Sequence, residues 1–357
     1  MSEKNEFLDI SYCYTGRVKT PAGEIPSVST ELVFKDRCDA YKARWGIKRS
    51  AYRVKPAVYA IGEPNEHSPM LVTANYKLTF DVVRRSMDGQ NAWLMVIDTK
   101  GVNVWCAAGK GTFGTNEVIK RIKEFKVGRI IAHKKLILPQ LGATGVAAHE
   151  VTKATGFKVL YGPVDSKDLP EYISEGNTAT QKMRTVKFGI RARIVLTPIE
   201  LMTSLKYCLI ALAFFFFFNW IGSEMFFSKA LLLAILSTIP YLGAIIVGAV
   251  LVPALLPFLP FRAFSLKGLV LGAVYSAVLV LFLQTPFLLD RGIMFLISNL
   301  LIINALISYL ALNFTGSSTY TSFTGAIKET KLAVLIMLPA AIVGLLLMIV
   351  DKIVTLV

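Results

Sequence analysis

The sequence after residue 200 contains five long apolar runs, which restrict the possible folds more than any other feature of the chain. A helix that crosses a lipid bilayer needs about 20 consecutive apolar residues. Helices that are apolar on all sides and follow one another through short links are typical of membrane domains rather than of soluble cores. The runs cover residues 201–221, 231–255, 266–288, 293–312 and 332–350. We therefore predict a transmembrane domain of five helices over residues 199–357.

Residues 1–198 have the charge density of a soluble domain, and we predict that they form one. The 357-residue chain carries a net charge of +15, and residues 1–200 contain 31 Lys and Arg against 20 Asp and Glu. A basic domain beside a membrane suits anionic lipid, an anionic cofactor or an acidic partner protein. The sequence contains no nucleic-acid recognition module, so we expect no nucleic-acid partner.

The basic residues between the apolar runs predict the orientation in the membrane, because cytoplasmic links are enriched in Lys and Arg. They divide as follows: Lys187, Arg191, Arg193, Arg262, Lys267, Lys328 and Lys331 on one side, and Lys229, Arg291 and Lys352 on the other. The N-terminus is polar and does not read as a signal peptide. We therefore predict a multi-pass protein of the cytoplasmic membrane, with its soluble domain in the cytoplasm.

Apolar strands alternate with helical patterns in the soluble part. The predicted strands are residues 58–61, 70–74, 93–98, 128–132 and 158–163, and the predicted helices are 78–87, 116–125 and 146–155. This alternation predicts an α/β domain with a doubly wound (Rossmann-like) parallel sheet. Residues 1–50 fit no clear pattern, and the basic segment 42–53 is interpreted as a solvated face.

The stretch 101–115 follows a predicted strand, at the sheet edge where open α/β folds bind ligands. It holds Cys106 between Trp105 and the small residues Ala107, Ala108 and Gly109. The other cysteines are distant and form no Cys-x-x-Cys pair, so no disulfide framework, iron–sulfur site or structural zinc site is expected. A lone thiol in this place indicates a ligand or a nucleophile. A resemblance described below implies a short cap helix near residues 102–110.

Residues 109–114 spell G-x-G-x-x-G, but their context differs from that of a dinucleotide-binding turn. About ten residues separate Asp98 from Gly109, and the next predicted strand ends at Ala132 without an acidic residue. We interpret these glycines as positions where the backbone approaches a cofactor and the next helix begins. The three histidines, His67, His133 and His149, are interpreted as surface or hydrogen-bonding residues.

Three further turns follow predicted strands: residues 73–77, 140–144 and 161–163. Each is ordinary turn chemistry when taken alone. Because the carboxyl ends of parallel strands meet at one edge, we expect these turns to lie beside Cys106 and to share a cofactor site with it.

The stretch N-V-W-C-A-A-G-K, residues 103–110, closely resembles the cap-helix signature of the corrinoid proteins that methylate mercury in anaerobes, the HgcA family. Residues 71–80, 136–143 and 161–164 resemble the same family, as does a corrinoid domain followed by five membrane helices. The soluble part also resembles the large subunit of the corrinoid iron–sulfur protein. That subunit, however, has an iron–sulfur domain and lacks membrane helices.

The resemblance implies a base-off cobalamin whose lower cobalt ligand is the thiolate of Cys106. A thiolate is a soft, strongly donating ligand for such a metal. Lys110, one turn away, would help to deprotonate the thiol, and Asn103 and Trp105 would orient the helix. Alanines 107 and 108 would leave room for the corrin plane. The cofactor-binding residues expected from the resemblance and the sheet edge are Thr73, Asn75, Lys77, Asn103, Trp105, Cys106, Ala107, Gly109, Lys110, Gly111, Thr112, Gly142, Ala143 and Gly162.

The function implied by the resemblance is a cobalamin-dependent methyltransferase that passes a methyl group from methyl-cobalt(III) to Hg(II), forming methylmercury. A methyltetrahydrofolate-dependent system would supply the methyl group. Because this chain has no iron–sulfur cysteines, a ferredoxin-like iron–sulfur protein would supply the electrons. Two alternatives remain: a membrane-anchored methylcorrinoid carrier of one-carbon or acetyl-CoA metabolism, and a membrane transporter with a regulatory domain.

Overall fold

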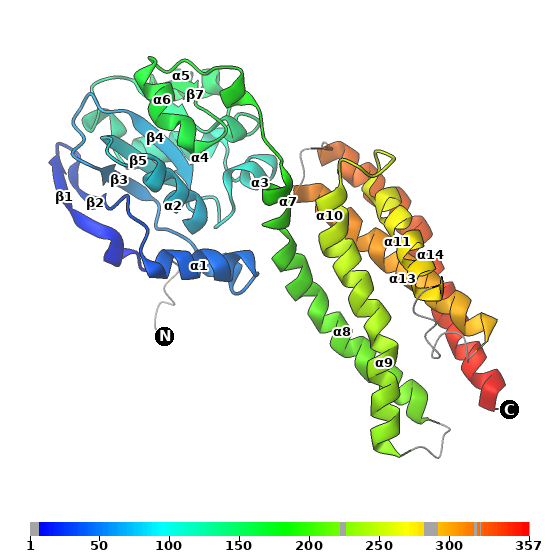
Figure 1. Ribbon diagram of the computed structural model, residues 1–357. Helices are drawn as coiled ribbons and strands as arrows, with labels where there is room; N and C mark the ends of the chain where they lie inside the picture. Colours follow the sequence, from blue (N-terminus) through cyan, green and yellow to red (C-terminus); the bar gives the residue numbers. More distant parts are fainter. Residues whose placement is uncertain (1–6, 222–225, 282–291, 318–319, 322, 357) are drawn as a thin grey trace. The chain divides into compact units, whose positions relative to one another are not determined.

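The computed structural model describes residues 7–221, 226–281, 292–317, 320–321 and 323–356 (Figure 1). The chain divides into two compact units, Met1–Val186 and Lys187–Val357. The division predicted from the sequence, at residue 198, falls inside the first long helix of the second unit, which begins at Thr197.

The first unit is built on a seven-stranded mixed sheet with helices on both faces (Figure 1). The strand order is β1-β2-β3-β5-β4-β6-β7. The strands are β1 (Tyr14–Thr20), β2 (Gly23–Val28), β3 (Ala57–Ile61), β4 (Met70–Ala74), β5 (Ala92–Ile97), β6 (Lys135–Leu138) and β7 (Lys158–Tyr161). The helices are α1 (Phe34–Arg44), α2 (Lys77–Ser86), α3 (Val104–Gly109), α4 (Thr115–Glu124), α5 (Ala148–Thr155) and α6 (Leu169–Ser174).

The central strands β4 and β5 are buried along their whole length, as is typical of strands covered on both faces. One hydrophobic cluster packs α3, α4 and α5 against the side chains of Met70, Val72 and Ala74. A second cluster packs α2 and α6 against the opposite face, which includes Leu71. The alternation of side chains along β4 thus assigns each neighbouring residue to one face or the other.

The sheet is mixed, which corrects the prediction of a parallel one. Strands β5, β4, β6 and β7 are mutually parallel, but β3 pairs antiparallel with β5, and β1 and β2 form an antiparallel hairpin. The link between β3 and β4, residues 62–69, contains no helix and is too short for a parallel crossover, which needs about a dozen residues. The α/β class and the coverage of both faces agree with the prediction.

The predicted strand at residues 128–132 was also wrong. Val127–Arg129 form a short 3-10 turn. Ile130 and Ile131 follow it in irregular backbone, and both side chains are buried. The strand β6 lies a few residues later, in a segment to which no strand was assigned from the sequence. It ends before Pro139, which has no backbone N–H to donate to a sheet. Residues 1–50, which fitted no pattern, contain the β1–β2 hairpin and α1.

The second unit contains five helical segments that are long and apolar enough to cross a membrane, judged by length and composition: Ile190–Trp220, Phe227–Leu255, Phe264–Leu281, Ile293–Gly316 and Thr324–Thr355. Its helices are α7 (Ile190–Ile194), α8 (Thr197–Trp220), α9 (Phe227–Ile246), α10 (Val252–Leu255), α11 (Phe264–Leu281), α13 (Ile293–Asn313) and α14 (Phe323–Leu356). The third predicted run, 266–288, extends beyond the described residues after position 281. A π-helical turn, Val247–Leu251, joins α9 to α10.

Basic side chains cap the end of α10 inside the second unit. Arg193 donates hydrogen bonds to the carbonyl oxygens of Pro253 and Ala254, at 3.1 and 3.0 Å. Lys267 donates to those of Leu256 and Leu259, at 2.6 and 3.0 Å. The last carbonyls of a helix have no partner within it, and cations are favoured there. These two residues, which contributed to the predicted orientation, therefore also stabilise the fold locally.

Candidate functional site

Cys106 lies in the first turn of α3, and Asn103 sets the start of that helix. Asn103 has extended backbone angles, and its side-chain oxygen accepts a hydrogen bond from the Cys106 N–H at 2.9 Å. This is the N-cap arrangement, in which a side chain satisfies one of the free N–H groups of the first turn. The Cys106 side chain is half-buried and its sulfur is free. The cap therefore fixes the backbone of the residue that carries the thiol.

Asn75, at the end of β4, holds the turn that leads into α3. It is fully buried, and its Oδ1 accepts hydrogen bonds from the N–H groups of Thr99 and Gly101, both at 3.0 Å, and from the Thr99 hydroxyl at 2.9 Å. Its Nδ2 donates to Asp98 at 3.0 Å. We expected Asn75 to bind the cofactor directly; in the structure, its amide positions the loop that presents Cys106.

The same turn needs a glycine at position 101. Lys100 and Gly101 both have left-handed backbone angles, with φ of 59° and 72°. A Cβ on Gly101 would lie 2.8 Å from Cγ of Arg53. Burial alone would raise the pKa of Asp98, but hydrogen bonds from Lys100 bring it below its usual range. The carboxylate therefore remains charged and keeps its place in the turn.

Glycines of the loop after β6 let that loop pack directly on α3. A Cβ on Gly145 would lie 3.0 Å from Cα of Ala108 and 2.2 Å from the carbonyl oxygen of Phe113. A Cβ on Gly142 would lie 2.6 Å from the Phe113 ring, which is fully buried. We predicted a role for Gly142 but missed Gly145. Its sequence signal is the Gly-x-x-Gly spacing after a strand.

The exposed side of α3 presents bare backbone beside the thiol. Trp105 is 40% exposed, and Gly109, Lys110 and Gly111 are exposed as well. A Cβ built on Gly109 or Gly111 meets nothing within 4 Å. Gly111 has a φ of 78°, which favours glycine. A flat ligand could therefore approach the backbone here without displacing a side chain.

Ala107 and Ala108 do not lie on this surface, which corrects the expectation that they leave room for a corrin plane. Ala107 is fully buried and Ala108 nearly so, and both belong to the hydrophobic cluster beneath the helix. Small side chains are needed there because the loop at Gly145 approaches so closely. The room for a flat ligand comes from the glycines at 109 and 111 instead.

Thr73 and Lys77 are on the other face of the sheet and are not brought together with Cys106. Thr73 alternates with Val72 and so shares the face of Leu71. Lys77 is fully buried, and its Nζ pairs with Asp36, at 2.6 Å, and with Asp81. Because both carboxylates engage this amine, we correct the prediction that Lys77 binds the cofactor.

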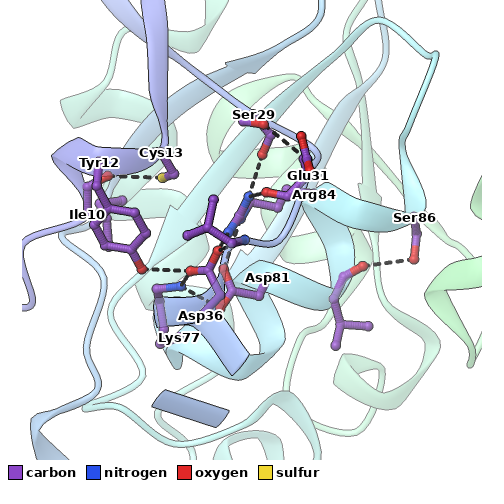
Figure 2. A network of polar contacts seen from close by, with 12 residues as sticks. Ile10, Tyr12, Cys13, Ser29, Glu31, Asp36, Lys77, Asp81, Arg84 and Ser86 are labelled. Atoms are coloured by element: carbon purple, nitrogen blue, oxygen red, sulfur yellow. Dashed lines mark hydrogen bonds and ion pairs between the residues drawn. The ribbon is translucent and has the colours of Figure 1, made fainter. Parts of the chain in front are cut away.

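Lys77 belongs to a buried charge cluster made by Asp36, Lys77, Asp81 and Arg84 (Figure 2). Arg84 pairs with Asp36 at 2.7 Å and with Asp81 at 2.8 Å. The Tyr12 hydroxyl donates to Asp36 at 2.6 Å. Burial alone would raise the pKa of Asp36, but hydrogen bonds from Lys77 and Tyr12 lower it to about 2. The cluster ties α1 and the N-terminal segment to α2.

The remaining predicted residues lie at the carboxyl edge of the sheet or in the turn after α3. The Thr112 N–H donates to the carbonyl oxygen of Ala107 at 2.9 Å and ends the helix. Ala143 is half-buried in the loop that packs on α3. Gly162 follows β7, and a Cβ there would lie 3.0 Å from Ile137. These positions contribute to the backbone and packing of the sheet edge, whereas Trp105 and Gly109 of α3 are exposed to solvent.

The donor set at the site limits what it could hold. Within the part of the chain that the structure describes, no group of three or more His, Cys, Asp or Glu side chains could hold a metal ion. Cys106 can supply one ligand and not a coordination shell.

Comparisons with known proteins match the first unit. A family model described as the CO dehydrogenase/acetyl-CoA synthase delta subunit matches residues 46–173, which include Asn75 and Cys106. The curated relatives include gamma subunits of the acetyl-CoA decarbonylase/synthase complex. That of Methanopyrus kandleri is 36% identical over 130 residues, which cover 36% of this chain and 28% of the relative. The subunit of Archaeoglobus fulgidus is 34% identical over 129 residues, which cover 36% of this chain and 27% of the relative. The subunit of Methanothermobacter thermautotrophicus is 33% identical over 129 residues, which cover 36% of this chain and 28% of the relative. The match thus spans little more than a quarter of the length of these relatives.

Proposed function

We propose that the first unit binds a corrinoid at the carboxyl edge of its sheet and that Cys106 supplies the protein's ligand to the cobalt. The observation that carries this proposal is the Asn103-capped helix α3, which holds one half-buried thiol beside uncovered backbone at Gly109 and Gly111. The relatives are subunits of a complex named for acetyl-CoA decarbonylase/synthase activity, which is in keeping with one-carbon chemistry. A bound corrinoid would supply a cobalt centre that can accept and release a methyl group.

The residues of this chain would then act by holding and positioning. Asn103 fixes the N–H of Cys106, and Asn75 fixes the turn before it, so the sulfur is presented from a rigid base. Gly109 and Gly111 let the ring lie against the backbone, and Trp105 offers an exposed aromatic surface at its side. A preorganised ligand of this kind keeps the metal's electronic properties constant.

We further propose that the methyl acceptor is Hg(II) and the product methylmercury. The support is the resemblance of residues 103–110 to the mercury-methylating corrinoid proteins and the joining of such a domain to five membrane-length helices. In this proposal the first unit lies on the cytoplasmic side. A methyltetrahydrofolate-dependent system supplies the methyl group, and a ferredoxin-like iron–sulfur protein supplies electrons to the basic domain.

The test uses Cys106→Ala in the full chain, with Cys38→Ala as the matched control. Purified protein reconstituted with cobalamin should show sulfur bound to cobalt by absorbance and X-ray absorption, and this signature should vanish in Cys106→Ala alone. Methylmercury formation should fall by about two orders of magnitude or more. A Cys106→Ala protein that methylates at the parent rate would refute the assignment of the ligand.

A second function is favoured by the names of the relatives: a membrane-anchored methyl carrier of acetyl-CoA metabolism. It keeps the cofactor and the role of Cys106 but changes the acceptor. Protein loaded with methylcobalamin can be offered Hg(II) and, separately, an acetyl-CoA-forming enzyme with carbon monoxide and coenzyme A. Transfer of the methyl group to mercury alone supports the first proposal. Its incorporation into acetyl-CoA alone supports the second.

A further inference from the structure

Helix α1 carries its aromatic residues on the outside. Phe34, Tyr41 and Trp45 are 81%, 64% and 43% exposed, and Cys38 lies between them with partial exposure. Their spacing of four, three and four residues places them in one stripe along the helix, since a helix turns about 100° per residue. Large aromatic side chains in a solvent-facing row are unusual for a soluble domain and indicate a surface that contacts another phase or molecule.

Two rows of cations flank the stripe. Lys35 and Lys42 follow one side of it, and Arg37 and Arg44 follow the other. All four are exposed, and the exposed Ile47 and Lys48 follow the helix. Across residues 33–50 every exposed charge is positive, because the two acids of this segment, Asp36 and Asp39, are buried. The outward surface is thus aromatic in the middle and basic on both sides.

The buried acids fix this orientation. Asp36 faces inward and pairs with Lys77 and Arg84 in the charge cluster (Figure 2). Turning the aromatic stripe inward would expose these partners or leave them buried without a countercharge, which is strongly unfavourable. The helix is therefore held with its charged face toward the protein and its aromatic face outward.

We propose that α1 lies in the headgroup layer of an anionic lipid bilayer, with Phe34, Tyr41 and Trp45 inserted and the four flanking cations bound to lipid phosphates. Aromatic rings favour the interface between lipid and water, and Lys and Arg near an anionic leaflet are attracted to it. The same chain carries five membrane-length helices, so the first unit is tethered near a bilayer and encounters its surface at high effective concentration. Two residues of the basic segment that we interpreted as a solvated face, Lys42 and Arg44, are thereby assigned a ligand.

The native Cys38 in the middle of the stripe reports on this contact. The full chain, prepared without cobalamin so that the Cys106 thiol is free, is placed in nanodiscs of phosphatidylcholine or phosphatidylglycerol and treated with a neutral polyethylene-glycol maleimide. Alkylation of each cysteine is followed by peptide mass spectrometry, with the half-exposed Cys106 as the internal reference. The ratio of the Cys38 rate to the Cys106 rate should fall about tenfold or more in phosphatidylglycerol. It should recover at about 0.5 M salt, where surface charges are screened.

Two matched variants separate this surface from general basicity. Lys35→Gln/Arg37→Gln/Lys42→Gln/Arg44→Gln should restore the alkylation of Cys38 in phosphatidylglycerol. Lys120→Gln/Lys123→Gln/Arg129→Gln/Lys153→Gln removes the same charge from exposed positions elsewhere and should leave the protection intact. Phe34→Ser/Tyr41→Ser/Trp45→Ser should weaken the protection without unfolding, because all three side chains are exposed.

Three results would overturn the proposal. The first is equal protection of Cys38 in the two lipids. The second is equal loss of protection in the two charge variants. The third is protection that appears in phosphatidylcholine only after an acidic protein is added, which would assign the surface to a protein partner instead. The measurement is independent of methyl transfer, so it does not depend on the proposed function.

Discussion

Asn75 shows how one buried side chain can serve a site that it does not touch. Its single oxygen accepts three hydrogen bonds from Thr99 and Gly101, and its nitrogen donates to Asp98. These hydrogen bonds hold the turn before α3, so the amide at position 75 serves the loop that carries Cys106.

We expect Asn75→Ala to destabilise the chain by about 3 kcal/mol, because buried N–H groups of Thr99 and Gly101 would lose their acceptor. The exposed Asn116→Ala serves as the control and should change stability by less than about 0.5 kcal/mol. Thermal unfolding followed by tryptophan fluorescence measures both. Similar melting temperatures for the two variants would show that the loop holds without the Asn75 amide.

Asp36 gives the first unit a defined sensitivity to acid. Its pKa in the folded protein is about 2, below the usual value of 3.8 for an aspartate, so its carboxylate stabilises the fold fully above about pH 4. As the pH falls from about 4 to 2, the unfolded chain takes up a proton at this carboxyl more readily than the folded protein does, and about 2 kcal/mol of stability is lost. Asp36→Asn should flatten the dependence of the unfolding free energy on pH in this window. Parallel curves for the two proteins would contradict the assignment.

At the scale of elements, the pair formed by α3 and the loop after β6 is the main determinant of the candidate site. The two elements touch through backbone at Gly145 and Ala108, and Phe113 fills the space at Gly142. Neither element is long enough to hold its place alone. The position of Cys106 relative to the sheet edge therefore depends on glycines that are distant from it in sequence.

Two glycine substitutions should separate packing from ligand binding. Gly145→Ala would place a methyl group 2.2 Å from the Phe113 carbonyl oxygen and should destabilise the protein by about 2 kcal/mol. Gly109→Ala adds the same methyl group where nothing lies within 4 Å, so the cofactor-free protein should be as stable as the parent or slightly more so.

The Gly109→Ala protein should nevertheless bind cobalamin at least about tenfold more weakly, because the methyl group occupies the proposed contact surface. Equilibrium titration followed by absorbance measures the affinity. If Gly109→Ala binds as tightly as the parent, the ring does not lie on this part of α3, and the proposed contact surface is wrong.

At the scale of the whole molecule, the hydrophobic clusters separate cleanly. The two clusters of the first unit draw on residues between Leu8 and Met183, and those of the second draw on residues between Phe188 and Met348. Each unit thus has its own core within the described residues. A unit with its own core can fold by itself.

We therefore expect a fragment of residues 1–186 to be soluble and to unfold cooperatively. Circular dichroism and thermal unfolding of the isolated fragment provide the measurement, with the full chain in nanodiscs for comparison. A fragment that lacks cooperative unfolding would mean that the membrane part contributes to the core of the first unit.

Some features follow from the sequence alone because they depend on neighbouring residues. The length and apolarity of the runs after residue 200 predicted five membrane-length helices, and the local period of apolar residues located β4, β5, α2, α4 and α5 to within a few residues. The helix α5 ends at Thr155, as predicted, and Gly156 follows it with left-handed backbone angles. The position of Cys106 after a buried strand predicted a place for its thiol at the carboxyl edge of the sheet.

Other features were decided only by the tertiary structure, because they depend on which distant segments meet. The direction of β3 depends on the short link to β4. The sheet contains β6 in place of the strand predicted at 128–132, because the backbone of β6 pairs with β4 and β7. Asn75 and Lys77 are two residues apart, yet one positions the loop of Cys106 and the other is buried among acids from α1 and α2. Side chains two positions apart at the end of a strand can leave it in different directions, and only the packed partners determine which chemistry each one serves.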